Sequence, residues 1–325
     1  MVPVASTRQL AEAGQIANTA RPVRILVTGA DGFLGSHLVR ELAQDGHAVV
    51  PLVFGRAARA GEFRIDLTQP AGLAALDGAF DAVVHAAGRV DGHASYAAMF
   101  AANVEATANV ARWARKQGVR HFVHFSSVAV YGPLTLGEGR DERTPRLGLR
   151  LGLPYMRTKA LAERLVEQSG VPYTLVRSPV VIGAGDTVIS RGFRDALLGR
   201  GLPLLPGASL KRRVSLAFVE GLAEVVRRLL ARGPLLGPVH AADAEVSFGE
   251  LADAYAQLLG VRRNVTSISW KQAVQAIPEV GFTWLVASAR FGQHYARERL
   301  VSELGYRSPR SLESAIRSGL SSLQG

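Results

Sequence analysis

Tyr155 and Lys159 stand four residues apart in a segment whose pattern is typical of a helix. Residues at positions i and i+4 share one helix face, so the phenol and the ammonium can project toward one ligand. A neighbouring cation favours the phenolate and lowers the pKa of a tyrosine, which is about 10 in water. Tyr155 could then exchange a proton with a reacting oxygen. Because a core tyrosine beside a solvated lysine has the same spacing, other segments must support this chemistry.

A glycine-rich turn follows the first apolar run of the chain. Residues 23–27 are typical of a buried parallel strand, and Gly29, Gly32 and Gly35 come next, ahead of leucines spaced as in a helix. Such glycines let the backbone approach a pyrophosphate, and the helix N-terminus presents unpaired N–H groups to it. The spacing Gly-x-x-Gly-x-x-Gly differs from the commoner Gly-x-Gly-x-x-Gly, and a plain glycine turn is the alternative. In this strand, turn and helix context we expect a dinucleotide site.

Strands and helices alternate along the first half of the chain, which builds a doubly wound parallel sheet of the Rossmann type in an α/β protein. Ser127 directly follows an expected strand, at the edge where open α/β sheets bind their ligands. The expected strands after the glycine turn cover 47–54, 63–67, 82–86, 121–126 and 173–177, and the expected helices cover 93–117 and 155–169.

Several further motifs occur in a consistent order along the chain. They are Thr28 to Gly35, Asp66-Leu67, His85 to Gly88, Asn103-Val104 with Thr107, Ser126-Ser127, Val130 to Gly132, Tyr155 with Lys159, and Arg177 followed by Gly183 to Asp186. With these motifs the chain resembles the extended short-chain dehydrogenase/reductase family, also called the NAD-dependent epimerase/dehydratase superfamily, along nearly its whole length.

The resemblance implies a role for each matching residue. Tyr155 would be the general acid/base, Lys159 its electrostatic partner and a ribose ligand, and Ser127 a hydrogen-bond donor to the substrate oxygen. Asp66 would lie near the adenine. The full implied cofactor site comprises Gly29, Gly32, Phe33, Leu34, Gly35, Asp66, Leu67, Ala86, Ala87, Gly88, Asn103, Tyr155, Lys159 and Pro179.

The choice between NAD and NADP depends on the end of the second strand. An acidic residue about twenty residues beyond the glycine turn would bind a ribose 2′-hydroxyl. None stands there, and Arg56 and Arg59 follow the strand instead. Either guanidinium could meet a 2′-phosphate with paired hydrogen bonds, so we expect NADP, with Arg56 as a ligand and NAD as the alternative. The other interpretation is that both arginines face solvent.

The chain is long enough for a large cofactor-binding domain and a smaller lobe. We assign residues 1–22 to an N-terminal extension and residues 23–178 to the NAD(P)-binding domain, to which residues 215–245 return. Residues 179–214 and 246–325 form the expected, discontinuous substrate-binding lobe.

The expected lobe lacks polar groups that nucleotide-sugar members of the resembled family usually carry. Val180 stands where they have an asparagine and Gly221 where they have an aspartate, while Arg213 lies one position away from their arginine. Apolar residues replace these groups and either line a pocket or form the core of the lobe. They are Leu202, Leu204, Leu205, Phe218, Phe282, Trp284, Leu285 and Phe291.

The segment 154–163 looks most like the 3β-hydroxysteroid dehydrogenase-like branch. We therefore expect an NAD(P)-dependent oxidoreductase that interconverts a secondary alcohol and a ketone on a fairly apolar small molecule. One alternative is a nucleotide-sugar epimerase or dehydratase with tightly bound NAD. Another is a redox-silent nucleotide-sensing regulator, although such proteins typically lose the tyrosine or the lysine.

Composition restricts the remaining possibilities. The net charge of +11 is spread over scattered arginines, so we expect no nucleic-acid partner. No cysteine is present, which is consistent with a reducing cytoplasm, and no window is apolar enough to span a bilayer. We expect no metal site. The resemblance implies a homodimer formed through the helices 93–117 and 155–169.

Overall fold

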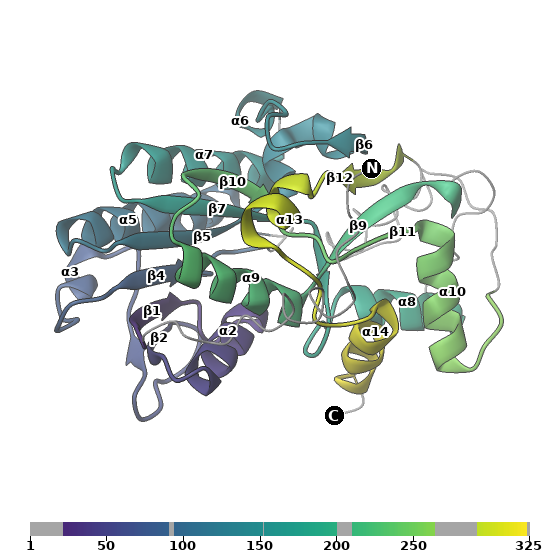
Figure 1. Cartoon of the computed structure of the whole chain (residues 1–325), viewed down its shortest axis with the longest axis horizontal. Helices are drawn as coiled ribbons and strands as arrows, with labels where there is room; N and C mark the ends of the chain where they lie inside the picture. The colour runs from purple at the N-terminus through teal and green to yellow at the C-terminus, as the bar shows by residue number, and fades with distance from the viewer. Residues whose placement is uncertain (1–21, 91–93, 152, 200–209, 264–290, 324–325) are drawn as a thin grey trace, which may run out of the picture.

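A computed structural model of the chain describes residues 22–90, 94–151, 153–199, 210–263 and 291–323. Its larger sheet is entirely parallel, with the strand order β10-β7-β5-β4-β1-β2-β3 (Figure 1). The order reverses between β1 and β4, which confirms the doubly wound α/β fold expected from the sequence. The strands are β1 (Arg24–Thr28), β2 (Ala48–Val53), β3 (Phe63–Arg64), β4 (Ala82–His85), β5 (His121–Ser127), β7 (Tyr173–Ser178) and β10 (Gly237–His240).

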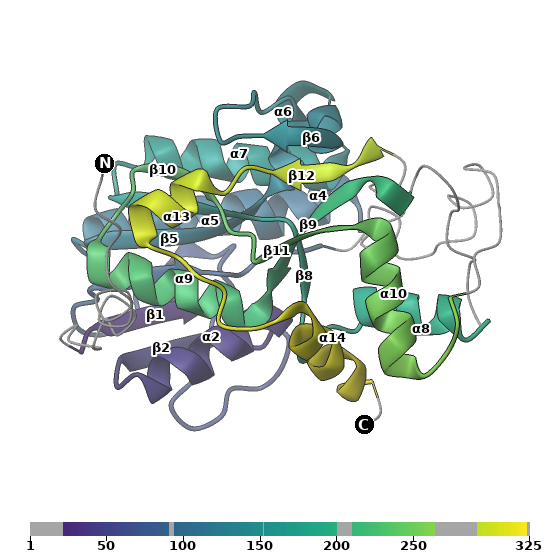
Figure 2. The same ribbon diagram turned by 45° about the vertical axis from the view of Figure 1, so that its right-hand side comes forward.

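Helices cover both faces of this sheet (Figures 1 and 2). Successive residues of β1 are fully buried and point to opposite sides, Ile25 and Val27 into one apolar cluster and Leu26 into the other. Burial on both faces explains why parallel strands are almost continuously apolar in the sequence. The helices on the first side are α2 (Phe33–Gln44), α9 (Val219–Arg232) and α13 (Glu298–Leu304), and those on the other are α3 (Pro70–Leu73), α5 (Ala106–Lys116) and α7 (Pro154–Gln168).

A second sheet lies beside the carboxyl ends of the first (Figure 2). Its order is β11-β9-β12-β6, and β8 pairs with β9. The strands are β6 (Gly137–Arg140), β8 (Val180–Ile182), β9 (Arg213–Phe218), β11 (Ala244–Ser247) and β12 (Gln293–Tyr295). Three helices pack together next to it around the stacked rings of Phe193 and Tyr255, namely α8 (Ile189–Leu197), α10 (Phe248–Leu259) and α14 (Leu312–Ser321).

The segment expected to return to the first domain divides between the two sheets. Helix α9 and strand β10 join the larger sheet, whereas β9 and β11 pair with each other in the second one. The division of the chain into a cofactor domain and a substrate lobe stays a prediction, and the N-terminal extension lies outside the described residues except for residue 22.

Two expected elements are interrupted. Strand β3 ends at Arg64 rather than residue 67, because the Asp66 carboxylate accepts hydrogen bonds from the Thr68 amide and hydroxyl and turns the chain. The expected helix 93–117 consists of α4 (Tyr96–Phe100), a π-helical turn (Ala101–Glu105) and α5. This π-turn carries the buried Asn103, and such turns occur frequently at functional sites.

Asp243 fills the space beside Gly221, which stands where members of the resembled family have an aspartate. Its carboxylate accepts hydrogen bonds from the Phe218 amide at 2.6 Å, the Tyr306 hydroxyl at 2.5 Å and the Ser308 hydroxyl at 2.6 Å. A Cβ added at Gly221 would overlap this carboxylate. The Asp243 carboxylate, which comes from the connection between β10 and β11, thus occupies the space that a side chain at position 221 of α9 would need.

Gly221→Ala is expected to lower the free energy of unfolding by about 1–3 kcal/mol, because the added methyl group forces the Asp243 carboxylate out of its hydrogen bonds. Chemical denaturation measures this change. The same substitution in an Asp243→Ala background should be better tolerated, since the overlapping oxygens are gone. Equal losses in both backgrounds would show that crowding by Asp243 is not the cause.

Candidate active site

A cleft of about 480 Å³ lies at the carboxyl ends of β1, β4, β5 and β7. All three candidate catalytic residues, Ser127, Tyr155 and Lys159, line it. The expected cofactor residues that line the same cleft are Gly29, Gly32, Phe33, Leu34, Gly35, Ala86, Gly88, Asn103 and Pro179. The cleft therefore brings together most of the site predicted from the sequence.

Tyr155 lies in the first turn of α7, and its phenol interacts with the Ser127 side chain. The Ser127 hydroxyl also accepts a hydrogen bond from the Ala129 amide at 3.1 Å, which fixes its position at the end of β5. Burial raises the pKa of the Tyr155 phenol, and the interaction with Ser127 opposes this shift. Desolvation outweighs the effect of Ser127 in this arrangement, and the effect of Lys159 on the phenol stays a prediction.

Lys159 is 7% exposed, and its Nζ donates to the Phe125 carbonyl oxygen at 2.6 Å. Burial lowers the pKa of Lys159 to about 8, while the Glu163 carboxylate opposes this change. A Cβ added at Gly88 would lie 3.8 Å from the Lys159 Nζ and 3.1 Å from the Asn103 Oδ1. The glycine therefore leaves the region beside both side chains open, and all three residues line the cleft.

Asn103 connects the segment that follows β4 to helix α7 through hydrogen bonds. Its Oδ1 accepts from the Arg89 amide at 2.6 Å, and its Nδ2 donates to the Arg89 carbonyl at 3.0 Å and to the Thr158 hydroxyl at 3.1 Å. Thr158 immediately precedes Lys159 on α7. The hydrogen bond from Asn103 in the π-turn therefore helps to hold this part of α7 in place.

The glycine turn fits a dinucleotide phosphate. Gly29 has a φ of +69°, and a Cβ there would lie 2.8 Å from the Ala87 backbone. At Gly35 an added Cβ would overlap the Gly29 carbonyl, so the turn and α2 can pack this closely only without side chains. Gly32 caps α2 without a side-chain hydrogen bond. The first-turn N–H groups of α2 are thus oriented at the cleft for an anion.

The expected adenine-side residues lie outside the cleft lining. Asp66 is held by Thr68, Leu67 is buried in the core, and its carbonyl accepts from Asn109 at 2.9 Å. The Ala87 amide donates to the Thr28 hydroxyl at 3.2 Å. These residues shape the strand ends behind the cleft.

Arg56, the expected ligand for a 2′-phosphate, forms a bidentate ion pair with Glu62, both N–O distances being 2.6 Å. No acidic residue directly follows β2 in the sequence, but an acidic side chain from another segment lies at this strand end. The Asp31 Oδ2 accepts from the amides of Phe54 at 3.1 Å and Gly55 at 2.6 Å. Asp31 belongs to the glycine turn, so only the folded chain brings it to this strand end.

The remaining wall of the cleft is mostly apolar. Val180 and its neighbours line it, together with the polar residues Thr135 and Gln293, which sequence reasoning missed. Gln293 comes from β12, far along the chain, and no spacing marks it in the sequence. The apolar lining residues on this side are Val128, Ala129, Val180, Val181, Val188 and Ile189.

Of the apolar residues proposed for a substrate pocket, the two that the structure describes do not line the cleft. Phe218 is buried in the core beside α8 and α10, and Phe291 is exposed. Arg213 is paired with Glu245 at 2.7 Å and does not line the cleft. Outside the described residues lie Leu202, Leu204, Leu205, Phe282, Trp284 and Leu285.

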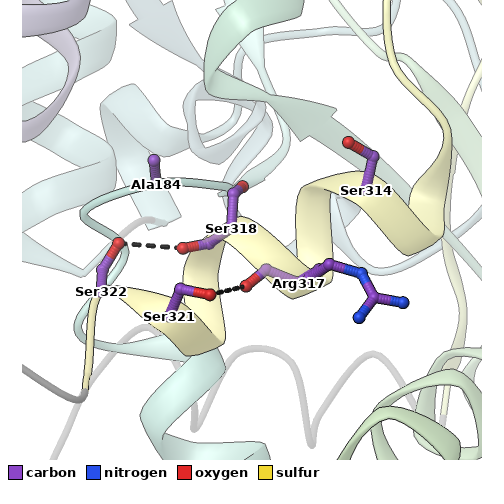
Figure 3. Close-up of a pocket in the computed structure, with 6 residues that line it drawn as sticks. All are labelled: Ala184, Ser314, Arg317, Ser318, Ser321 and Ser322. Atoms are coloured by element: carbon purple, nitrogen blue, oxygen red, sulfur yellow. Dashed lines mark hydrogen bonds between the residues drawn. The ribbon is translucent and has the colours of Figure 1, made fainter.

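A second hollow, of about 560 Å³, is formed by one side of α14 and Ala184 (Figure 3). Two of its serine hydroxyls donate to backbone carbonyls one turn earlier, Ser321 to that of Arg317 and Ser322 to that of Ser318. The Arg317 guanidinium pairs with Glu313 at 2.7 Å. These groups are therefore already paired, and the hollow is a weaker candidate for a site than the cleft.

Behind Lys159, the same face of α7 carries a buried ion pair. The Glu163 carboxylate accepts from Arg177 Nε at 2.9 Å and Nη2 at 2.7 Å, and also from Arg146 at 3.2 Å. Arg177 donates further to the Tyr131 hydroxyl at 2.8 Å, which lies 2.5 Å from His240 Nε2. The network links α7 to β7, β10 and the turn after β5.

Two other kinds of feature are absent from the described ranges. No cluster of histidine and acidic side chains there is suited to hold a metal ion. Within the same ranges, none of the helices has the length and apolar character that crossing a bilayer requires.

Residues 25–237 match the model of the NAD dependent epimerase/dehydratase family, and the chain belongs to this family. Among curated relatives, it is 30% identical over 259 residues to a ceramide reductase of Caulobacter vibrioides, covering 76% of this chain and 74% of that protein. The membership confirms the resemblance seen in the motifs.

Two further relatives match over shorter stretches. They are a 2-alkyl-3-oxoalkanoate reductase of Stenotrophomonas maltophilia, 33% identical over 50% of this chain, and the human 3 beta-hydroxysteroid dehydrogenase type 7, 33% identical over 55% of it. The chain spans about half the length of each, 52% and 55%.

Solved structures share the fold. The Bordetella bronchiseptica enzyme WbmH, in complex with NAD+, superposes with a TM-score of 0.75 at 20% identity, over 94% of this chain and 99% of its own. A UDP-galactose 4-epimerase superposes with a TM-score of 0.69 at 24% identity, over 93% and 98%. At these identities the likeness concerns the fold.

Proposed function

We propose that the protein is an NAD(P)-dependent oxidoreductase that interconverts a secondary alcohol and a ketone on a fairly apolar small molecule. The observation that carries this proposal is that Ser127, Tyr155 and Lys159 line one cleft with the glycine turn. When bound, the nicotinamide supplies or accepts the hydride. The side chains then have to orient the substrate and move one proton.

In this proposal Tyr155 exchanges the proton with the substrate oxygen, and Ser127 donates a hydrogen bond to the same oxygen. Because burial raises the pKa of the phenol, Tyr155 is protonated at neutral pH in the arrangement described. That protonation state suits the donation of a proton during ketone reduction. The Lys159 ammonium would bind the ribose hydroxyls and favour the phenolate as it forms.

An apolar substrate is supported by the cleft wall and by the relatives. Val180, Val181, Val188 and Ile189 line the cleft, and apolar walls with few polar groups are typical of sites for hydrophobic ligands. Three relatives are named for a 2-alkyl-3-oxoalkanoate, a 3β-hydroxysteroid and a ceramide. Arg213, the nearest candidate for a sugar-nucleotide diphosphate, is paired with Glu245 away from the cleft.

The test is a titration of the purified protein with NADH and NADPH, followed by a panel of hydrophobic ketones and nucleotide sugars. Oxidation of the reduced nicotinamide by a hydrophobic ketone, read from its absorbance, is the expected result. Purified protein that carries NAD and isomerises a nucleotide sugar without net redox would be an epimerase instead. Cofactor binding without turnover of any compound would favour the nucleotide-sensing regulator.

The preference for NADP over NAD stays a prediction from the sequence, and two contacts bear on it. Arg56 is bound to Glu62, and the Asp31 carboxylate lies at the end of β2. These contacts oppose the attraction of Arg56 for a 2′-phosphate, so we propose a weaker preference for NADP(H) than an unpaired arginine would give. Homodimerisation and a cytoplasmic location stay predictions from the sequence.

The affinity for either dinucleotide is expected to fall as the pH rises above about 8. Burial lowers the pKa of Lys159 to about 8, so its ammonium loses the proton above that value and no longer binds the ribose hydroxyls. Lys159→Ala should weaken cofactor binding by about tenfold at neutral pH, lower turnover and remove this pH dependence. Dissociation constants measured from pH 6 to about pH 10 check both effects.

Lys116→Ala is the matched control, since Lys116 is an exposed lysine at the end of α5. It should keep the affinity and its pH dependence. An unchanged decline of affinity at high pH in Lys159→Ala would assign the titration to another group.

A further inference from the structure

The connection between β2 and β3 is closed by an ion pair. Both Nη atoms of Arg56 donate to the Glu62 carboxylate at 2.6 Å, and Arg56 Nη1 also donates to the Ala57 carbonyl at 2.8 Å. The Glu62 Oε2 accepts in addition from the Arg59 amide at 2.8 Å. The side chains are 33% exposed for Arg56 and 15% for Glu62. The Glu62 carboxylate therefore occupies the edge of the Arg56 guanidinium that carries Nη1 and Nη2.

This ion pair follows β2, the strand whose end recognises the ribose 2′-position of a dinucleotide in doubly wound folds. In doubly wound folds that position is contacted by an acidic residue at the end of the second strand, or by a nearby arginine when a 2′-phosphate is present. Strand β2 ends at Val53, three residues before Arg56, and the Asp31 carboxylate binds the amides of Phe54 and Gly55. Asp31 also acts electrostatically on Arg56.

Glu62 carries its charge throughout the physiological range. Its hydrogen bonds with Arg56 and with the Arg59 amide hold the pKa of its carboxyl at about 2. A carboxylate and a phosphate both bind a guanidinium through two parallel N–H···O hydrogen bonds. A 2′-phosphate can therefore reach this edge of Arg56 only by displacing Glu62, whereas a 2′-hydroxyl has no need of it.

We propose that Glu62 is a specificity-determining residue, which occupies the Arg56 guanidinium and thereby lowers the affinity for NADP(H) relative to NAD(H). The inference rests on the proposed function, because it assumes that a nicotinamide dinucleotide binds along the glycine turn. Discrimination between the two cofactors would then arise from competition between the Glu62 carboxylate and the 2′-phosphate for the Arg56 guanidinium.

The test uses Glu62→Gln in the full-length protein. Dissociation constants for NADPH and NADH are measured by fluorescence titration at fixed ionic strength, with and without the substitution. NADPH should bind roughly fivefold more tightly to the variant, since the weakened pair releases Arg56, while the affinity for NADH stays unchanged. Glu62→Ala, which removes the carboxylate entirely, should shift the ratio in the same direction.

Glu313→Gln is the matched control, because Glu313 pairs with Arg317 on α14 and its loss changes the net charge equally. It should leave the ratio of the two dissociation constants unchanged. In an Arg56→Ala background, Glu62→Gln should no longer favour NADPH, because the guanidinium it releases is missing.

Two outcomes would overturn the inference: an unchanged ratio in both Glu62 variants, or an equal shift in the presence and absence of Arg56. A wild-type protein that binds neither NADH nor NADPH would overturn the proposed function itself, so the two failures are distinguishable.

Discussion

Tyr155→Phe is expected to lower kcat for ketone reduction by about 10³-fold and to leave the dissociation constant of the nicotinamide cofactor unchanged. The substitution removes one hydroxyl, which is the proposed proton donor and the partner of Ser127. The aromatic ring at position 155 remains, so the cleft that it lines should keep its shape. Steady-state kinetics with a turned-over ketone and a separate cofactor titration measure the two effects.

Tyr173→Phe is the matched control, because Tyr173 begins β7 and its ring lies at the end of the sheet away from the cleft. It should retain the wild-type kcat. Full activity in Tyr155→Phe would refute the acid/base assignment, and loss of cofactor binding would indicate that the ring had been displaced.

Glu163→Gln is expected to lower the free energy of unfolding by about 3–5 kcal/mol. The Arg177 side chain is 3% exposed and its guanidinium is paired with a fully buried Glu163 carboxylate. Neutralising Glu163 leaves this cation, and Arg146 in part, without its charged partner. Chemical denaturation at neutral pH measures the loss.

The pH dependence has a defined sign. The guanidinium groups of Arg177 and Arg146 hold the pKa of Glu163 below its ordinary value of 4.5, against the opposing effect of burial. A lowered folded-state pKa means that the stabilisation is present above pH 4.5 and is lost as the pH falls through the folded-state pKa. Glu163→Gln should therefore flatten the acid side of the stability profile.

Glu167→Gln is the control for this second substitution. Glu167 pairs with Arg146 at 2.9 Å, but its side chain is 27% exposed, so solvent replaces the lost contact. Its loss should cost less than about 1 kcal/mol. Similar losses for both variants would show that the buried pair is not more important than a partly exposed one.

The sequence predicted the larger sheet closely, because its signals are local. Strands β1, β4, β5 and β7 match the expected apolar runs to within one or two residues. A strand buried on both faces has to be apolar throughout, and a turn that approaches a phosphate has to lack side chains, so both leave a mark in adjacent residues. Elements shaped by packing, such as the π-turn that carries Asn103, left no such mark.

The candidate site divides in the same way. The sequence by itself determined the family and the doubly wound fold, and it predicted the set of Ser127, Tyr155 and Lys159, because these depend on residue types at short, fixed spacings. The tertiary structure decided the charge and contacts of the site. It brought Asp31 to the end of β2, set Glu62 against Arg56, and placed Gln293 in the cleft wall.

The pKa of Tyr155 illustrates the physical reason. Spacing alone predicts that the nearby Lys159 lowers this pKa, whereas burial raises it in the folded chain, and the ammonium donates to the Phe125 carbonyl. Desolvation and pairing between segments distant in the chain arise only when the chain is packed, so no local pattern encodes them. Residue spacing therefore determined which groups the site contains, and packing decided their protonation and their partners.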